Sequence, residues 1–111
     1  LKALFCADAT ADEFLTFVGT FQPDENLDAG GPDDRAQAGT WGAIPRTFIR
    51  LGEDRSIPLP MQDRLIREGD ALTPDNPYRV ITLDSSHLRW LIRPAEAAEA
   101  IAGIVAEVRA R

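Results

Sequence analysis

Residues 46–58 read RTFIRLGEDRSIP, and residues 78–92 read YRVITLDSSHLRWLI. Each stretch opens with a short run of β-branched, aromatic and aliphatic residues, at 47–51 and at 78–83, which predicts a strand. Between them, residues 59–68 are predicted to form a helix, because Pro60 is tolerated in a first turn and Gly69 is a common helix end. The order strand, helix, strand, helix predicts an α/β fold with parallel strands covered by helices.

Both predicted strands run into a polar loop, and each loop holds one group that commonly serves in catalysis. These groups are Asp54 and His87, the single histidine of the chain. In open parallel sheets, functional residues gather at the carboxyl ends of the strands, so we expect the two side chains at the same edge. Each also has a structural alternative. An aspartate in a turn often accepts local backbone N–H groups, and a lone histidine in a loop is often structural. Their matching positions favour a catalytic pair.

Two further helices are predicted on either side of this unit. Near the amino terminus, Thr10 and Glu13 have the spacing of a capping box, and Phe14, Phe17, Val18 and Phe21 follow on one helical face that ends before Pro23. That face is either core packing or the wall of an apolar substrate pocket. The last helix is predicted to begin at Pro94. Two apolar stripes are expected to be buried: Met61, Leu65 and Ile66 in the middle helix, and Ala97, Ile101, Ile104, Val105 and Val108 in the last.

Residues 22–44 show neither a helical nor a strand period, which predicts a long connecting loop. Its acidic residues are expected to form a solvated surface, because their spacing does not match a calcium-binding loop. They are Asp24, Glu25, Asp28, Asp33 and Asp34.

Composition narrows the classes of function. The chain has 111 residues and a net charge of −6, with a pI near 4.6, so a nucleic-acid partner is not expected. No apolar run approaches the roughly 18 residues that a membrane span needs, and no leader pattern occurs, so we expect a cytoplasmic protein without a membrane partner. Cys6 has no second cysteine to pair with and is predicted to be a buried apolar filler.

Several segments together resemble the C-terminal part of an α/β-hydrolase: RTFI at 46–49, EDRSIP at 53–58, MQ at 61–62, SHL at 86–88 and RP at 93–94. Within that superfamily the chain is similar to the esterase branch that holds plant methylesterases and hydroxynitrile lyases. The resemblance implies that Asp54 is the triad acid and His87 the triad histidine. It also implies that residues 1–44 end the cap region and that 45–111 form the C-terminal βαβα part of the core. The related lyases carry a lysine directly after the histidine. Leu88 stands there, which favours ester or lactone hydrolysis.

The resemblance also implies a serine in a Gly-x-Ser-x-Gly elbow, and this sequence contains none. With Leu1 rather than Met at the start, we expect the C-terminal portion of a larger hydrolase, inactive without its nucleophile-bearing part. Phe14, Phe17, Leu88 and Trp90 are the expected contacts to an apolar ester substrate, and no metal or cofactor is implied. Two parallel strands alone leave apolar surface uncovered, so we expect either the N-terminal part of the same hydrolase or a second copy in a homodimer to cover it. The alternative is a non-enzymatic α/β binding or assembly module.

Overall fold

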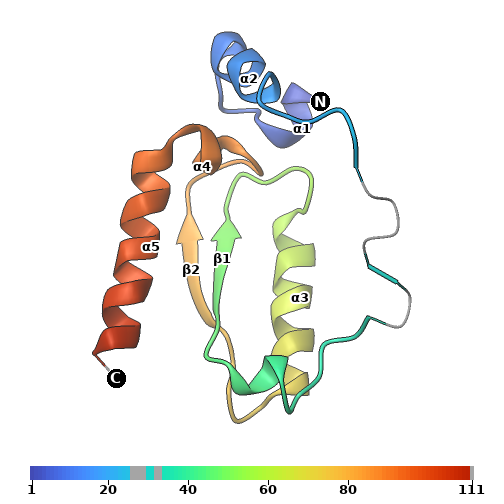
Figure 1. Cartoon of the computed structure of the whole chain (residues 1–111), viewed down its shortest axis with the longest axis vertical. Coiled ribbons are helices and arrows are strands. Elements are labelled where there is room, and N and C mark those ends of the chain that lie inside the picture. The colour runs from blue at the N-terminus through green and yellow to red at the C-terminus, as the bar shows by residue number, and fades with distance from the viewer. Residues whose placement is uncertain (26–29, 32–33, 111) are drawn as a thin grey trace.

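A computed structural model describes residues 1–25, 30–31 and 34–110 of the chain (Figure 1). Two of the acidic residues predicted on the connecting loop, Asp28 and Asp33, lie outside the described residues. Within them the elements follow in this order: α1 (Lys2–Phe5), α2 (Ala11–Val18), a 3₁₀ turn η1 (Trp41–Ala43), β1 (Thr47–Leu51), α3 (Leu59–Leu72), β2 (Arg79–Leu83), α4 (Arg89–Ile92) and α5 (Pro94–Arg109).

The two strands pair in parallel, as the sequence predicts. Thr47 lies opposite Arg79, and the register continues to Leu51 opposite Leu83. Beyond the strands, the N–H of Gly52 donates to the carbonyl of Leu83 at 2.9 Å. Figure 1 shows α3 and α5 on opposite sides of the strands, and α1, α2 and α4 beyond their carboxyl ends. The α/β class is therefore confirmed, and the two post-strand loops leave the sheet at one edge, beneath α1 and α2.

The predicted capping box is present at the start of α2. The Thr10 side chain accepts the N–H of Glu13 at 3.1 Å, and the Glu13 carboxylate accepts the N–H of Thr10 at 2.8 Å. The helix ends at Val18, well before Pro23, so Phe21 lies beyond it rather than on its face.

The predicted end of α3 at Gly69 is wrong, because the helix runs on to Leu72. Gly69 serves close packing instead: a Cβ at this position would lie 2.6 Å from the Tyr78 ring. The next residue, Asp70, accepts the N–H of Tyr78 at 2.7 Å. The last turn of α3 thus contacts Tyr78, the residue just before β2. That strand begins at Arg79 rather than at Tyr78.

Arg46 ties the amino ends of the two strands together. Its guanidinium lies 4.0 Å from the centroid of the Trp41 ring and 5.0 Å from that of Tyr78. It also donates to the carbonyl of Trp41 at 3.1 Å, the hydroxyl of Thr73 at 2.5 Å and the carbonyl of Asn76 at 2.8 Å. This cation–π and hydrogen-bond cluster fixes the end of the sheet away from the candidate site.

The two predicted apolar stripes are only partly buried. In α3, Met61 and Leu65 are 49% and 43% exposed, and the buried side chain is Gln62. In α5, Ala97 is buried, but Ile101, Val105 and Val108 are exposed. A two-stranded sheet is too narrow to cover a whole helix face on each side, which explains both errors. No helix in the described part of the chain combines the length and hydropathy needed to cross a membrane.

Candidate active site

Asp54 lies buried in the loop that follows β1. One carboxylate oxygen, Oδ1, accepts the backbone N–H groups of Ser56 at 2.8 Å and Ile57 at 2.9 Å. These bonds curl the loop around the carboxylate in the manner of an Asx turn. The turn-capping role that the sequence allowed for Asp54 is therefore present, but it occupies only this one oxygen.

Gln62, in α3, binds the same loop. Its amide accepts the N–H of Leu51 at 2.8 Å and donates to the carbonyls of Leu51 at 2.9 Å and Ile57 at 2.8 Å. It is 3% exposed, so these three bonds satisfy a buried polar group. No functional role was predicted for Gln62 from its own chemistry. The available signal was its spacing: Gln62, Ile66 and Gly69 fall on one face of a helix. On that face Gln62 binds Leu51 of β1, and Gly69 lies against Tyr78.

His87 completes the pair from the loop after β2. Its Nδ1 lies 2.8 Å from Oδ2 of Asp54, the oxygen that the loop backbone leaves free. An ionised carboxylate can only accept, so Nδ1 carries the proton, and in the neutral imidazole Nε2 then keeps its lone pair. The Asp54 side chain is 2% exposed and that of His87 is 26% exposed. The carboxylate of Asp54 is therefore buried and held by its own loop, whereas the imidazole of His87 is partly exposed to solvent.

His87 lines two apolar cavities. The larger, of about 330 Å³, lies toward α1 and α2 and is lined by Leu1, Phe5, Phe14, Val18, Phe21, His87 and Leu88. The smaller, of about 190 Å³, lies toward β1 and α3 and is lined by Phe48, Ile49, Leu51, Asp54, Ile57, Gln62, Leu65 and His87. The ring of Phe5 packs at a tilt against His87, with 5.5 Å between centroids. A reacting group beside Nε2 would thus sit in largely apolar surroundings.

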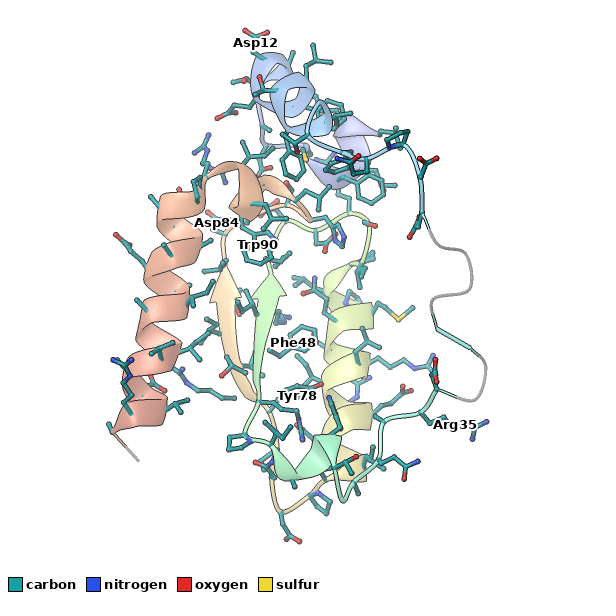
Figure 2. The ribbon with its side chains drawn as sticks, in the orientation of Figure 1. Asp12, Arg35, Phe48, Tyr78, Asp84 and Trp90 are labelled. Atoms are coloured by element: carbon teal, nitrogen blue, oxygen red, sulfur yellow. The ribbon has the colours of Figure 1, made fainter. Side chains whose placement is uncertain are left out.

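The four predicted substrate contacts separate into two groups. Phe14 and Leu88 line the larger cavity with His87. Phe17 lines a different hollow, between α2 and α4, and packs edge-on against Phe21 at 5.0 Å. Trp90, at the carboxyl ends of the strands (Figure 2), donates its indole N–H to the carbonyl of His87 at 3.1 Å. Trp90 therefore contacts the backbone of His87. The wall of the larger cavity also includes Phe5, Val18 and Phe21.

The hydroxyls beside His87 are already engaged. Ser85 and Ser86 are buried; Ser85 donates to the carbonyl of Ser86 at 2.9 Å, and Ser86 donates to Asp8. Neither is placed to act as a nucleophile for the imidazole. Cys6 is fully buried, as predicted, and burial raises the pKa of its thiol, as does the nearby charge of Asp8. No three His, Cys, Asp or Glu side chains of the described ranges gather closely enough to hold a metal ion.

No known family model and no curated protein matches this sequence. The assignment of a function therefore depends on the geometry of the pair and of the cavities around it.

Proposed function

We propose that this chain is the C-terminal portion of a serine α/β-hydrolase that cleaves carboxylic esters or lactones. In this proposal Asp54 and His87 are the acid and histidine of the triad, and a serine comes from a separate N-terminal part. The observation that carries the proposal is the 2.8 Å contact between a sealed carboxylate and the only histidine, at the carboxyl edge of a parallel pair of strands. The sequence resemblance at residues 53–58 and 86–88 supports the same assignment.

In the proposed mechanism Nε2 of His87 takes the proton of the attacking serine hydroxyl. The serine oxygen adds to the ester carbonyl, and the imidazolium then returns the proton to the leaving alcohol. Asp54 keeps the proton on Nδ1, so Nε2 is the basic nitrogen, and it stabilises the imidazolium that forms. Base catalysis of this kind contributes about 10²–10⁴-fold in rate. A water molecule activated by the same Nε2 releases the acyl group in the second half of the cycle.

The larger cavity suggests which substrate part this chain binds. Its wall is almost wholly aromatic and aliphatic, and apart from His87 it offers no polar side chain. At about 330 Å³ it falls at the lower end of the range for small-molecule sites. An uncharged, apolar acyl or alcohol group fits this chemistry. Leu88 adds to the apolar wall directly beside the histidine.

A non-enzymatic binding or assembly module is the second candidate. The observation that favours it is the local role of Asp54, whose Oδ1 closes its own loop through Ser56 and Ile57. In that case the bond to His87 would only join two loops. The two candidates differ in one testable respect, which is whether a serine on another polypeptide becomes reactive in the presence of His87.

The test is labelling of the native preparation with a fluorescent fluorophosphonate, followed by the intact mass of every polypeptide. We expect a co-purifying polypeptide to carry the label on a serine. Substitution His87→Ala should abolish labelling without dissociating the two polypeptides, and the exposed neighbour Glu53→Gln should leave it unchanged. If this chain is found folded, alone and unlabelled, the hydrolase proposal fails and the module replaces it.

A further inference from the structure

The backbone on both sides of His87 is bound by the amino-terminal segment of the chain. The N–H of Ser86 donates to Oδ2 of Asp8 at 3.1 Å. The N–H of Leu88 donates to the carbonyl of Phe5 at 2.9 Å. His87 is thus held at its ring by Asp54, and the backbone N–H groups of its two neighbours are bound by residues about eighty positions earlier in the chain.

Asp8 is the centre of this arrangement. Its carboxylate also accepts the hydroxyl of Ser86, and Arg89 donates to Oδ2 at 2.9 Å. The same guanidinium nitrogen of Arg89 donates to the carbonyl of Asp84 at 3.2 Å, which closes the network around the turn that presents His87. Although Asp8 has an exposed backbone, its side chain is only 25% exposed. Partial burial acts to raise the pKa of Asp8, but the bonds from Ser86 and Arg89 outweigh it and hold the pKa below its ordinary value.

We propose that Asp8 is a positioning residue for His87, acting through Ser86 to keep the imidazole between Asp54 and the apolar cavity. This inference rests on the proposed function, because it assigns the role within the same site. Ser86 is fully buried, so removal of Asp8 would leave its N–H and hydroxyl without acceptors in a place that water does not reach. The turn must then rearrange, and His87 stands at its centre. A displacement of about 1 Å in a catalytic group can cost about 10²-fold in rate.

The segment that carries Asp8 also carries the cavity wall. Phe5 lies three residues before Asp8 and packs on the imidazole, while Phe14 and Val18 follow in α2. Asp8 therefore fixes the relative positions of the base and of the apolar wall. Loss of this bond is expected to lower kcat, because the base is misplaced, with a smaller change in KM.

The single histidine makes the test direct. Long-range ¹H–¹⁵N correlation spectra of the native preparation, with only this chain labelled with ¹⁵N, report the tautomer of His87 without overlap from other imidazoles. Asp8→Ala should lose the Nδ1-protonated tautomer in favour of a mixture, and Asp8→Asn, which retains one acceptor oxygen, should recover most of it. Asp12→Ala, an exposed acid in the first turn of α2, is the matched control and should leave the spectrum unchanged.

Turnover of the assembled enzyme supplies the second measurement. We expect Asp8→Ala to lower kcat about tenfold to hundredfold with KM changed less than about threefold. If Asp8→Ala does not fold, Ser86→Ala, which removes the hydroxyl that Asp8 accepts, decides the matter. A wild-type His87 spectrum in the variant that folds overturns the proposal, and a shifted tautomer in that variant supports it. The spectra need no serine, so failure of the hydrolase proposal would appear separately, as absent fluorophosphonate labelling.

Discussion

Asp54 gives one oxygen to its own loop and the other to His87, and this division determines what its removal should do. In Asp54→Asn the amide can still accept the N–H groups of Ser56 and Ile57 through its oxygen. Its NH₂ group would then face Nδ1, which reverses the preferred tautomer and protonates the nitrogen that must act as base. Under the proposed function, we expect kcat of the assembled hydrolase to fall about 10⁴-fold.

Esterase kinetics and fluorophosphonate labelling of the assembled preparation check this prediction. The adjacent exposed acid provides the control, and Glu53→Gln should retain kcat within about twofold, because Glu53 is exposed whereas Asp54 is buried. Activity in Asp54→Asn close to that of the wild type would mean that the contact with His87 is only structural.

Asp8 should also make the stability of the fold sensitive to acid. Its pKa in the folded chain lies below its ordinary value of 3.8, despite partial burial, because Ser86 and Arg89 bind the carboxylate. A folded pKa below the unfolded one stabilises the chain at pH values above the unfolded pKa, and this contribution is lost as the pH falls through the folded pKa. We therefore expect the free energy of unfolding to drop below about pH 4. Urea titrations should show a smaller drop in Asp8→Asn than in the wild type.

The sequence alone could identify Asp54 and His87 but not the residues that hold them. Each of the two follows a recognisable strand, and the rule for parallel sheets then places them at one edge. The bonds of Gln62 to Leu51 and of Asp8 to Ser86 join residues whose proximity depends on the packed fold. No local pattern marks such a pair.

At the scale of elements, the close approach of α3 to the start of β2 explains a glycine inside a helix. A Cβ at Gly69 would lie 2.6 Å from Tyr78, whose ring is also held by Phe48 at 5.6 Å and Trp41 at 6.0 Å. Figure 2 places Phe48 and Tyr78 between β1 and α3. The ring cannot withdraw without disturbing this aromatic cluster.

Gly69→Ala is therefore expected to destabilise the fold by about 1–2 kcal/mol, because the clash exceeds the gain in helix propensity of about 1 kcal/mol. Gly103 in α5 offers a matched control, since a Cβ there would meet nothing within 4 Å. Gly103→Ala should stabilise by up to about 1 kcal/mol. Thermal unfolding of the two variants decides the question, and a stabilised Gly69→Ala variant would contradict the packing argument.

The order of the two strands and of α2, α3 and α5 was predictable, whereas the short helices α1 and α4, the helix lengths and the buried faces were not. Strand runs, the capping box and Pro94 are local signals, and the structure follows each of them. The local sequence predicts a helix end at Gly69, because the contact that explains this glycine is with Tyr78, which lies outside the helix. The spacing of Met61 and Leu65 predicts a buried stripe, but both residues are exposed. Amphipathic spacing shows which face of a helix is apolar, but it does not show whether another element covers that face.

The whole molecule presents more surface than a compact domain of its mass. Its accessible area is 7969 Å², against about 6,100 Å² expected for 12.2 kDa, and its radius of gyration is 16.1 Å, against about 13 Å. The buried apolar residues of the described part are few and mostly small: Cys6, Ala9, Leu51 and Ala97. Large apolar side chains on both long helices are exposed, so we expect this surface to be covered by another polypeptide or by a second copy of the chain.

The proposed function favours a nucleophile-bearing polypeptide as that cover, seated where the smaller cavity opens beside His87. Leu65 lines this cavity and is 43% exposed. Burial of a leucine contributes about 1.5–3 kcal/mol, so Leu65→Glu should weaken assembly at least about tenfold and lower the yield of labelled complex in proportion. Arg67→Glu, which places a new carboxylate at an exposed position of the same helix, is the control and should assemble normally. Sedimentation velocity of the mixed polypeptides measures the assembly of both variants. Unchanged assembly of Leu65→Glu would place the partner elsewhere, and the proposed serine could then not reach Nε2 of His87 from this side.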